Sequence, residues 1–343
     1  MPNDVLTRAI DALASGHDLP REQAGAVLGE IMRGDASESQ IAGFLIALRT
    51  KGETVDELAG LAGTMRALAT PVPADRGDLV DTAGTGGGKP TFNVSTTAAL
   101  IAAGAGCALA KHGNRSATGL SGSADVLEAL GARIDLGPGE VGRCIDRAGF
   151  GFMFAPAHHS ATRYVVPVRK ELAVRTIFNF LGPLTNPAGA TRQVIGVSDP
   201  AFLETIAGAL ARLGAERALV VSSHDGLDEI STSAPTRVVE VGGGETRSYE
   251  IAPEDVGLAR SDPEAFGAGL PEANADTTRR IFAGEPGPER DLALFNAGAA
   301  IYAGGRADTL REGVEAAAEA VDSGAAASSL DALTALTVKL SAG

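Results

Sequence analysis

The 343-residue sequence has few of the residues on which several classes of protein depend. It contains no tryptophan and only three tyrosines, and its 29 basic residues are outnumbered by 43 acidic ones, for a net charge of −14. Nucleic-acid binders normally present a basic face to phosphates, and single-strand binders stack bases on aromatic rings. The composition therefore argues against a nucleic-acid partner, although it leaves room for a local basic pocket.

Cysteine and long apolar runs are also scarce. Cys107 and Cys144 lie 37 positions apart, and this spacing fits buried thiols of a reduced enzyme better than a zinc site or a disulfide framework. No stretch approaches the roughly 18 apolar residues of a membrane span. The first residues, MPNDVLTRAIDALASG, carry acids where a signal peptide has basic and apolar regions. We expect a cytoplasmic protein without a membrane contact.

The first 70 residues have the periodicity of helices. Apolar side chains recur at the spacing of one buried helix face in two successive segments, namely Ile41, Phe44, Leu45 and Leu48, and then Leu58, Leu61, Met65 and Leu68. Each segment follows a candidate capping box, Ser37 with Gln40 and Thr54 with Glu57. This pattern predicts a small helical domain over residues 1–70, with a structural or oligomeric role.

After Pro71, short apolar runs alternate with helical stretches, which predicts an α/β domain with a mostly parallel central sheet. The predicted strands cover residues 79–83, 107–110, 151–154, 193–197 and 218–222. The predicted helices cover residues 95–103, 124–130, 141–148 and 201–213, and the Ala-rich region 288–341 should cover the sheet. One helical segment, 165–180, is expected to return to the N-terminal helices. The domain boundaries are therefore placed at 1–70, with the returning segment near 163–185, and at 71–162 with 186–343.

Ligands of open α/β sheets bind beyond the carboxyl ends of the strands, and a glycine-rich segment, 81–96, follows the first predicted strand. Its glycines allow a close approach of the backbone to an anion, and Asn93, Ser95 and Thr96 add donors at the helix start that follows. A Walker A loop would need Ser or Thr where Pro90 stands. We interpret the segment as a phosphate cradle, and the alternative is a simple turn.

Two further polar segments follow predicted strands. Lys111 and Arg115 provide positive charge that suits a second phosphate group, and the alternative is a solvated surface loop. Asp228 and Glu229 stand side by side in a short acidic turn, where a loop can direct both carboxylates at one Mg²⁺ ion. The alternative for the acidic turn is again a solvated loop.

Histidine and arginine residues in the middle of the chain are candidates for a second pocket. His158 and His159 lack the spacing of a zinc site, and one of them is expected to line the pocket; the alternative is an exposed or capping histidine. Arg163, Arg169 and Arg175 lie six apart on the predicted helical segment, so at most two of them can reach the same pocket.

Several sequence fragments carry a family resemblance: GTGG with TFNVST, KHGNRS with GSADVLEALG, FAPAHH with PVRKEL and RTIFNFLGPLTNP, and DGLDE. In this order, over nearly the whole chain, they resemble the anthranilate phosphoribosyltransferases of tryptophan biosynthesis. The resemblance implies a pentosyltransferase that moves the phosphoribosyl group of phosphoribosyl pyrophosphate to the amine of anthranilate, giving N-(5-phosphoribosyl)anthranilate and pyrophosphate. It also implies the two-domain plan shared with nucleoside phosphorylases, a homodimer formed through the helical domain, and two Mg²⁺ ions per subunit.

The resemblance also implies the residues of the site. Those that would bind substrates are Gly84, Gly87, Gly88, Thr91, Asn93, Val94, Ser95, Thr96, Lys111, His112, Gly113, Asn114, Arg115, Ser116, Ala117, Thr118, Gly119, Ser123, His159, Arg169 and Gly182. Among these, the residues that would surround anthranilate are His112, Asn114, His159, Arg169 and Gly182. Mg²⁺ would be held by Ser95, Asp228 and Glu229. The neutral aromatic amine is itself the nucleophile, so no protein base is required, and Lys111 with the two acids would stabilise charge.

The sequence departs from the family pattern in the glycine-rich loop and in the acceptor region. Gly88 stands where the family has aspartate, and the loop is one residue shorter, which leaves backbone N–H groups and Lys89 to meet the anion. Thr162 stands in place of Met, and Ala173 in place of Gly. The open alternatives are a pyrimidine nucleoside phosphorylase relative, a transferase with another amine acceptor, and a non-enzymatic nucleic-acid-binding relative of the fold.

Overall fold

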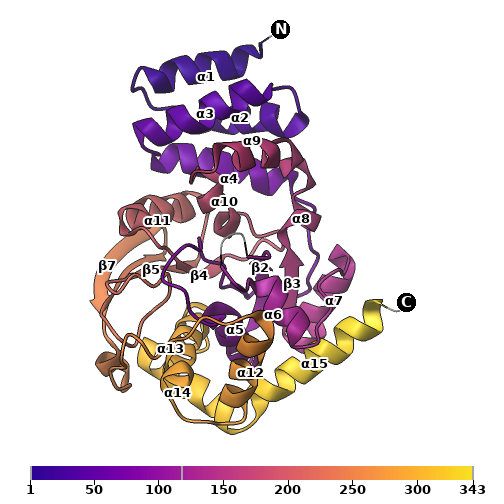
Figure 1. The fold of residues 1–343 in the computed structure, drawn as a ribbon, viewed down its shortest axis with the longest axis vertical. Helices are drawn as coiled ribbons and strands as arrows, with labels where there is room; N and C mark the ends of the chain where they lie inside the picture. The colour runs from indigo at the N-terminus through magenta and orange to yellow at the C-terminus, as the bar shows by residue number, and fades with distance from the viewer. Residues whose placement is uncertain (1, 117–118, 342–343) are drawn as a thin grey trace.

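The computed structural model describes residues 2–116 and 119–341, and a bundle of four helices forms its N-terminal part (Figure 1). The bundle helices are α1 (Asp4–Ala14), α2 (Arg21–Arg33), α3 (Glu38–Lys51) and α4 (Val55–Leu68). Their buried faces include Phe44, Leu45 and Leu61, as the periodicity predicts. The helical N-terminal part is therefore confirmed, but the expectation that Leu68 lies on the buried face was wrong, because it is the last residue of α4 and is 47% exposed.

Side-chain caps fix the starts of two bundle helices, α3 at Ser37 and α4 at Thr54. Thr54 and Glu57 form the complete capping box that the sequence predicts. At Ser37 the predicted box is incomplete, because the Gln40 side chain bonds to the Asn3 backbone instead. The Glu57 side chain is fully buried and also accepts hydrogen bonds from the Leu19 amide at 2.8 Å and from Lys51 Nζ at 3.0 Å. Glu57 therefore joins the start of α4 to the loop before α2 and to the end of α3.

The second part of the chain is built on a seven-stranded sheet with the order β3-β2-β1-β4-β5-β6-β7. The strands are β1 (Leu79–Asp81), β2 (Ala108–Gly113), β3 (Phe150–Phe154), β4 (Arg192–Gly196), β5 (Arg217–Ser223), β6 (Thr236–Gly242) and β7 (Glu245–Ile251). Strands β1 to β5 are parallel, and β6 and β7 are antiparallel additions at one edge. The five predicted strands are confirmed, whereas β6 and β7 were not predicted.

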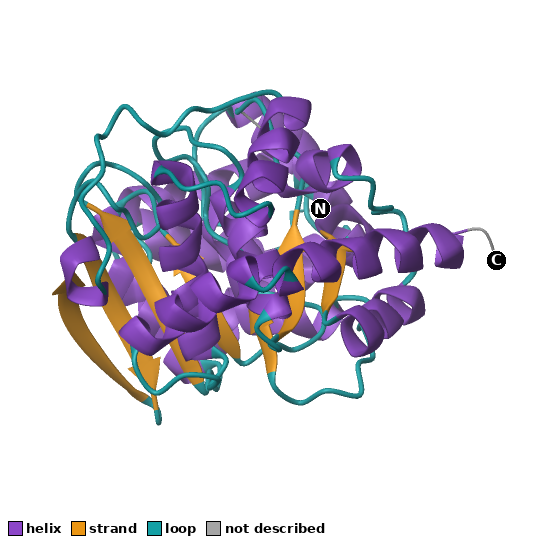
Figure 2. Ribbon diagram, turned by 90° about the horizontal axis from the view of Figure 1, so that it is seen from below, coloured by secondary structure: helices purple, strands orange, loops and turns teal. Residues whose placement is uncertain are grey.

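Helices cover both faces of the sheet, as Figure 2 shows. The helices of the α/β part are α5 (Val94–Gly104), α6 (Ser123–Ala129), α7 (Pro138–Ala148), α11 (Leu203–Arg212), α12 (Pro271–Phe282), α13 (Pro288–Ala303), α14 (Leu310–Asp322) and α15 (Ala325–Ser341), with short 3-10 turns η2 (Pro200–Phe202) and η3 (Pro253–Val256). Alternate residues of β5 face opposite cores: Leu219 packs with α5 and α13, and Val220 packs with α11 and the bundle. Within the described residues, each helix is too short or too polar to cross a membrane.

The segment 155–184 returns to the bundle as expected, but the helical stretch predicted over 165–180 is divided into short helices. It contains α8 (Ala155–His158), η1 (Ser160–Tyr164), α9 (Val166–Leu172) and α10 (Phe178–Leu184). Ala173 adopts the left-handed conformation, with φ of 50°, and ends α9. Arg175 therefore lies in the link between α9 and α10, and the expectation that it lies on a helix was wrong. Helix α9 packs on α3, and α10 packs on α4.

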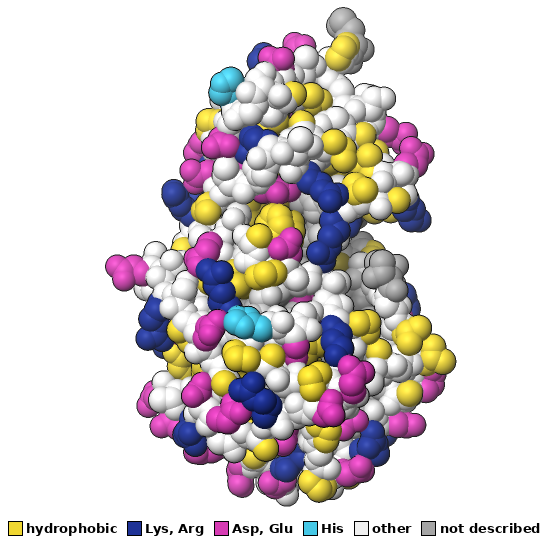
Figure 3. Space-filling model, turned by 60° about the vertical axis from the view of Figure 1, so that its left-hand side comes forward, with side chains coloured by type: hydrophobic (Ala, Val, Ile, Leu, Met, Phe, Trp, Pro, Cys, Tyr) yellow, Lys and Arg dark blue, Asp and Glu magenta, His cyan; other side chains and the backbone are white. Residues whose placement is uncertain are grey.

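The space-filling view shows a narrower waist between the bundle and the α/β part (Figure 3). Acidic and basic side chains are mixed over the face that is shown. The returning segment and the loops at the carboxyl ends of the strands meet near this waist, so we expect the site to lie there.

Candidate active site

The three predicted ligand segments meet at the carboxyl edge of the parallel strands. They follow β1, β2 and β5, and β4 separates the first from the last. The end of β4 holds the first and the last of these segments close together: the Thr85 amide donates to the Gly196 carbonyl at 2.8 Å, and a Cβ at Gly196 would overlap the Asp228 carbonyl. A glycine at this position therefore allows the acidic turn to lie beside the glycine-rich loop.

Gly88 lies directly against the acidic turn. The amide of the next residue, Lys89, donates to the Gly226 carbonyl at 2.8 Å, and a Cβ at Gly88 would overlap the Asp228 carboxylate. The shortened loop therefore leaves no room for the aspartate of the family pattern. Lys89 Nζ donates to the Pro263 carbonyl at 2.9 Å, so the expectation that Lys89 meets the anion finds no support in this structure.

Lys111 lies inside β2, because that strand continues to Gly113, and not in a loop after it. Its side chain is 1% exposed, and Nζ donates to the Thr82 carbonyl at 3.1 Å, to Thr82 Oγ1 at 2.9 Å and to Ser95 Oγ at 3.3 Å. Burial lowers the pKa of the Lys111 amine, and the charges of Asp81 and Glu229 act in the opposite sense. The buried cation therefore lies under the first turn of α5, and Lys111 is not part of a solvated loop.

Asp228 and Glu229 form a compact acidic pair that remains partly exposed. Burial raises the pKa of Asp228, and the amides of Gly88 and Gly86 and the charge of Arg175 partly offset that rise. Burial and the neighbouring Asp228 both raise the pKa of Glu229, whereas Lys111 and the Ser95 amide lower it. Two crowded carboxylates beside a serine hydroxyl are hard oxygen donors that fit Mg²⁺.

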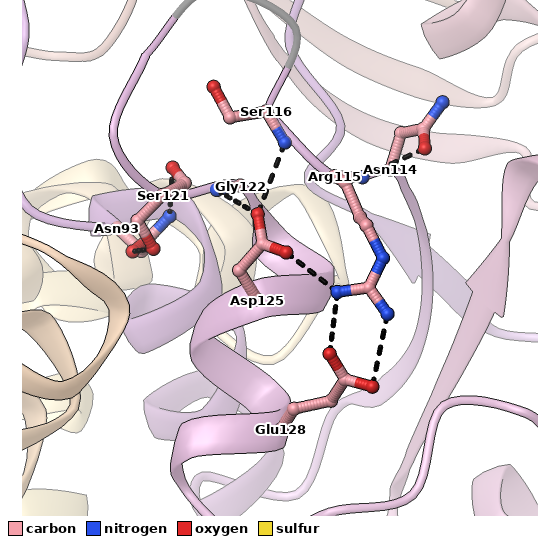
Figure 4. Close-up of polar contacts among 8 residues, drawn as sticks. All are labelled: Asn93, Asn114, Arg115, Ser116, Ser121, Gly122, Asp125 and Glu128. Atoms are coloured by element: carbon pink, nitrogen blue, oxygen red, sulfur yellow. Dashed lines mark hydrogen bonds and ion pairs between the residues drawn. The ribbon is translucent and has the colours of Figure 1, made fainter.

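The loop after β2 is tied down at its base by ion pairs, as Figure 4 shows. Arg115 Nη1 donates to Asp125 at 2.7 Å and to Glu128 at 2.6 Å. Asp125 also accepts from the amides of Ser116 and Gly122, at 3.2 and 2.8 Å. In this structure the Arg115 guanidinium therefore braces the loop. Two predicted substrate residues, Ala117 and Thr118, lie outside the described residues.

Asn93 joins this loop to the glycine-rich segment. Its Nδ2 donates to the Ser121 carbonyl at 3.1 Å, and its Oδ1 accepts from Ser121 Oγ at 2.8 Å and from Asn274 Nδ2 at 2.9 Å. Sequence reasoning missed Asn274, because no local signal in helix α12 relates it to a residue 181 positions earlier. The other residues predicted to bind substrates lie on the same elements. Gly84, Gly87 and Thr91 lie between β1 and α5, and Val94 and Thr96 lie in the first turn of α5. Gly113 ends β2, Asn114 and Gly119 lie in the loop after it, and Ser123 begins α6.

Two neutral histidines lie on the bundle side of the same edge. His112 Nδ1 lies 3.0 Å from the Gly182 carbonyl, and the rings of His112 and His159 are 5.1 Å apart. Burial lowers the pKa of His112 to about 3 and that of His159 to about 4. Both Nε2 atoms are buried without a hydrogen-bond partner among the described residues. Two unpaired polar atoms therefore mark a place for a ligand.

Arg169 on α9 is the cation of this second region. Its guanidinium lies 5.7 Å from the centre of the Phe178 ring, and burial lowers its pKa. Phe178 and Gly182 belong to the same helix, α10, so Arg169 and the histidine pair border one region. Neutral imidazoles, an aromatic ring and one arginine suit an aromatic carboxylate.

Comparisons with known proteins agree with this arrangement. Residues 7–69 match the helical bundle domain of a glycosyl transferase family, and residues 76–327 match its a/b domain. The anthranilate phosphoribosyltransferase of Symbiobacterium thermophilum is 53% identical over 331 residues, which cover 96% of this chain and 97% of that protein. The chain belongs to the anthranilate phosphoribosyltransferase family. The resemblance read from the sequence is thereby confirmed.

Solved members of the family have the same fold. The enzyme of Thermus thermophilus superposes with a TM-score of 0.91 at 47% identity, covering 96% of this chain and 99% of that chain. The Saccharomyces cerevisiae enzyme, solved in complex with PRPP and Mg, gives a TM-score of 0.87 at 26% identity, covering 97% and 98%. The yeast enzyme has also been solved with 4-fluoroanthranilate.

Proposed function

We propose that this member of the family transfers the phosphoribosyl group of phosphoribosyl pyrophosphate to the amine of anthranilate, as a step of tryptophan biosynthesis. The observation that carries the proposal is one sheet edge with two adjoining regions. One contains the glycine-rich loop, Lys111 and the acidic pair, and the other contains the histidine pair and Arg169.

In the reaction, the amine nitrogen of anthranilate forms a bond to C1 of the ribose while the bond from C1 to pyrophosphate oxygen breaks. Pyrophosphate leaves with the electron pair, and the amine loses a proton to solvent. The chain contributes positioning and charge stabilisation: backbone N–H groups of the glycine-rich loop and the first turn of α5, with buried Lys111, face the departing anion. Arg169 orients the acceptor through its carboxylate, and the neutral histidines leave the amine unprotonated.

The metal residues of this proposal are Ser95, Asp228 and Glu229, with two Mg²⁺ ions per subunit. When bound, Mg²⁺ neutralises charge on the pyrophosphate. Glu229→Gln keeps the shape and removes the charge, so activity should fall by about a hundredfold or more, as for other lost transition-state stabilisers. Glu245→Gln, on the exposed strand β7, is the matched control and should keep full activity. Full activity of Glu229→Gln at limiting Mg²⁺ would contradict the metal role.

Consumption of anthranilate, followed by its fluorescence, tests the function itself. The chain has no tryptophan, so the protein contributes little background. We expect the signal to fall only when protein, phosphoribosyl pyrophosphate and Mg²⁺ are all present. A panel of other aromatic amines tests the alternative acceptor, for which the polar Thr162, bonded to the His159 carbonyl at 2.7 Å, is the motivating residue. Consumption of another amine in preference to anthranilate would contradict the proposal.

We further propose a cytoplasmic homodimer whose subunits pair through the helical domain, residues 1–70 with the returning segment 163–185. Two free, buried cysteines are compatible with a reducing compartment. Helices α3 and α9 pack together, and both leave apolar side chains at the surface, Ile46 at 38% exposure and Val166 at 40%. Light scattering should give the mass of a dimer for the wild type and of a monomer for Ile46→Asp. An unchanged mass would place the contact elsewhere.

A further inference from the structure

Arg175 connects three parts of the molecule. Its Nη2 donates to the Gly86 carbonyl of the glycine-rich loop at 2.9 Å and to Ser198 Oγ, just after β4, at 2.6 Å. Its own carbonyl accepts from Arg49 Nη1 of α3 at 2.7 Å. One residue in the link between α9 and α10 therefore ties the bundle to the loop that faces the donor.

The link is shaped so that Arg175 reaches the loop. Ala173 ends α9 in the left-handed conformation, and the Thr176 amide donates to Asn179 Oδ1 at 3.0 Å at the start of α10. On the other side, Gly87 has φ of +87°, and a Cβ at this position would overlap the Arg175 guanidinium. The loop therefore presents bare backbone to Arg175, which fixes the position of the Gly86–Gly87 turn.

Arg175 also adds a positive charge near Asp228 of the acidic turn. The positive charge of Arg175 lowers the pKa of Asp228, against the effect of burial.

We propose that Arg175 is a positioning residue for the donor: it holds the Gly86–Gly87 turn in the conformation that receives pyrophosphate. The inference rests on the proposed function. Arg175 acts through the loop backbone and not by contact with the reacting atoms. Loss of its side chain should therefore loosen the loop before any substrate is present.

The first measurement is hydrogen exchange of peptides from residues 84–92 in the full-length protein without substrate. Arg175→Met removes the hydrogen bonds and keeps most of the volume, so we expect faster exchange in this segment. The matched control is Arg163→Met, because Arg163 lies exposed in the same returning segment. Among the described residues, its guanidinium interacts with Tyr164, through a hydrogen bond to Oη at 2.8 Å and a position 4.7 Å from the ring centre. Exchange as slow as in the wild type would overturn the inference.

The second measurement is calorimetric titration of phosphoribosyl pyrophosphate in Mg²⁺ buffer. Arg175→Met should weaken donor binding about tenfold, because the donor must then order the Gly86–Gly87 turn, at a free-energy cost comparable to one hydrogen bond made by a charged group. Arg175→Lys should recover part of the affinity, and the Michaelis constant for anthranilate should stay unchanged. Equal donor affinity of wild type and Arg175→Met would overturn the inference, whereas a wild type that does not bind the donor would overturn the proposed function instead.

Discussion

Asp81 and Lys111 show how the site keeps charge inside the protein. Asp81 is fully buried, and its carboxylate accepts from the His112 amide at 3.1 Å and from Asn186 Nδ2 at 2.7 Å. Burial raises its pKa to about 6, while Lys111 and Asn186 act in the opposite sense. A buried charge is tolerated only where partners compensate for lost water. The hydrogen bonds of these two buried residues therefore fix the protein layer beneath the residues that face the ligands.

Arg169 should determine the affinity for the acceptor. Its planar guanidinium can hold a carboxylate with two parallel hydrogen bonds, which lysine cannot reproduce. Arg169→Ala should raise the Michaelis constant for anthranilate by about 10- to 100-fold, as for a lost hydrogen bond to a charged group. The neighbouring Lys170→Ala is the control and should leave both constants unchanged. Equal effects of Arg169→Ala on donor and acceptor would place this arginine outside the acceptor region.

The buried histidines give the fold an acid-sensitive stability. Their folded pKa values, about 3 for His112 and about 4 for His159, lie below the ordinary value of 6.5, so between pH 6.5 and 4 the unfolded chain binds more protons. The free energy of unfolding should therefore fall as the pH falls, by about 1.4 kcal/mol per pH unit for each such histidine. Denaturant unfolding across this range should show a shallower slope for His159→Gln than for the wild type. Identical slopes for the two proteins would contradict a lowered pKa of His159 in the folded state.

At the scale of elements, one strained residue, Ala173, ends α9 and so separates it from α10 on the acceptor side. Ala173 has a positive φ, which costs a residue with a Cβ about 1–2 kcal/mol relative to the right-handed conformation. Ala173→Gly should raise the free energy of unfolding by about 0.5 kcal/mol, because the relieved strain exceeds the entropy that glycine adds to the unfolded chain. Ala283→Gly, at the exposed end of α12 with φ of −78°, should lower it. The same sign for both variants in denaturant titrations would contradict this account.

The elements show how far the sequence could predict the fold. Strands β1 to β5 were predicted because their residues are apolar runs buried on both faces, as in most parallel sheets. Strand β7 was missed because six of its seven residues are exposed or only partly buried, so ETRSYEI shows no apolar pattern. The break at Ala173 was missed because an alanine in the left-handed conformation has no local signal.

At the scale of the molecule, the glycine-rich loop, the first turn of α5 and the acidic turn could be predicted as one site because parallel strands bring their carboxyl ends to one edge. The partners that hold them could not be predicted. Arg175, Ser198 and Asn274 reach the site from distant parts of the chain, and only the tertiary fold joins them to it. The structure also changes the interpretation of Arg115, which braces a loop through Asp125 and Glu128.

The central claim is that the donor and its metal bind at this edge of the sheet, between the glycine-rich loop and the acidic turn. The most direct test is a crystal grown with phosphoribosyl pyrophosphate and Mn²⁺ in place of Mg²⁺, with an anomalous difference map to locate the metal. We expect anomalous density bounded by Ser95 Oγ and the carboxylates of Asp228 and Glu229. Bound donor with metal density away from all three residues would contradict the account.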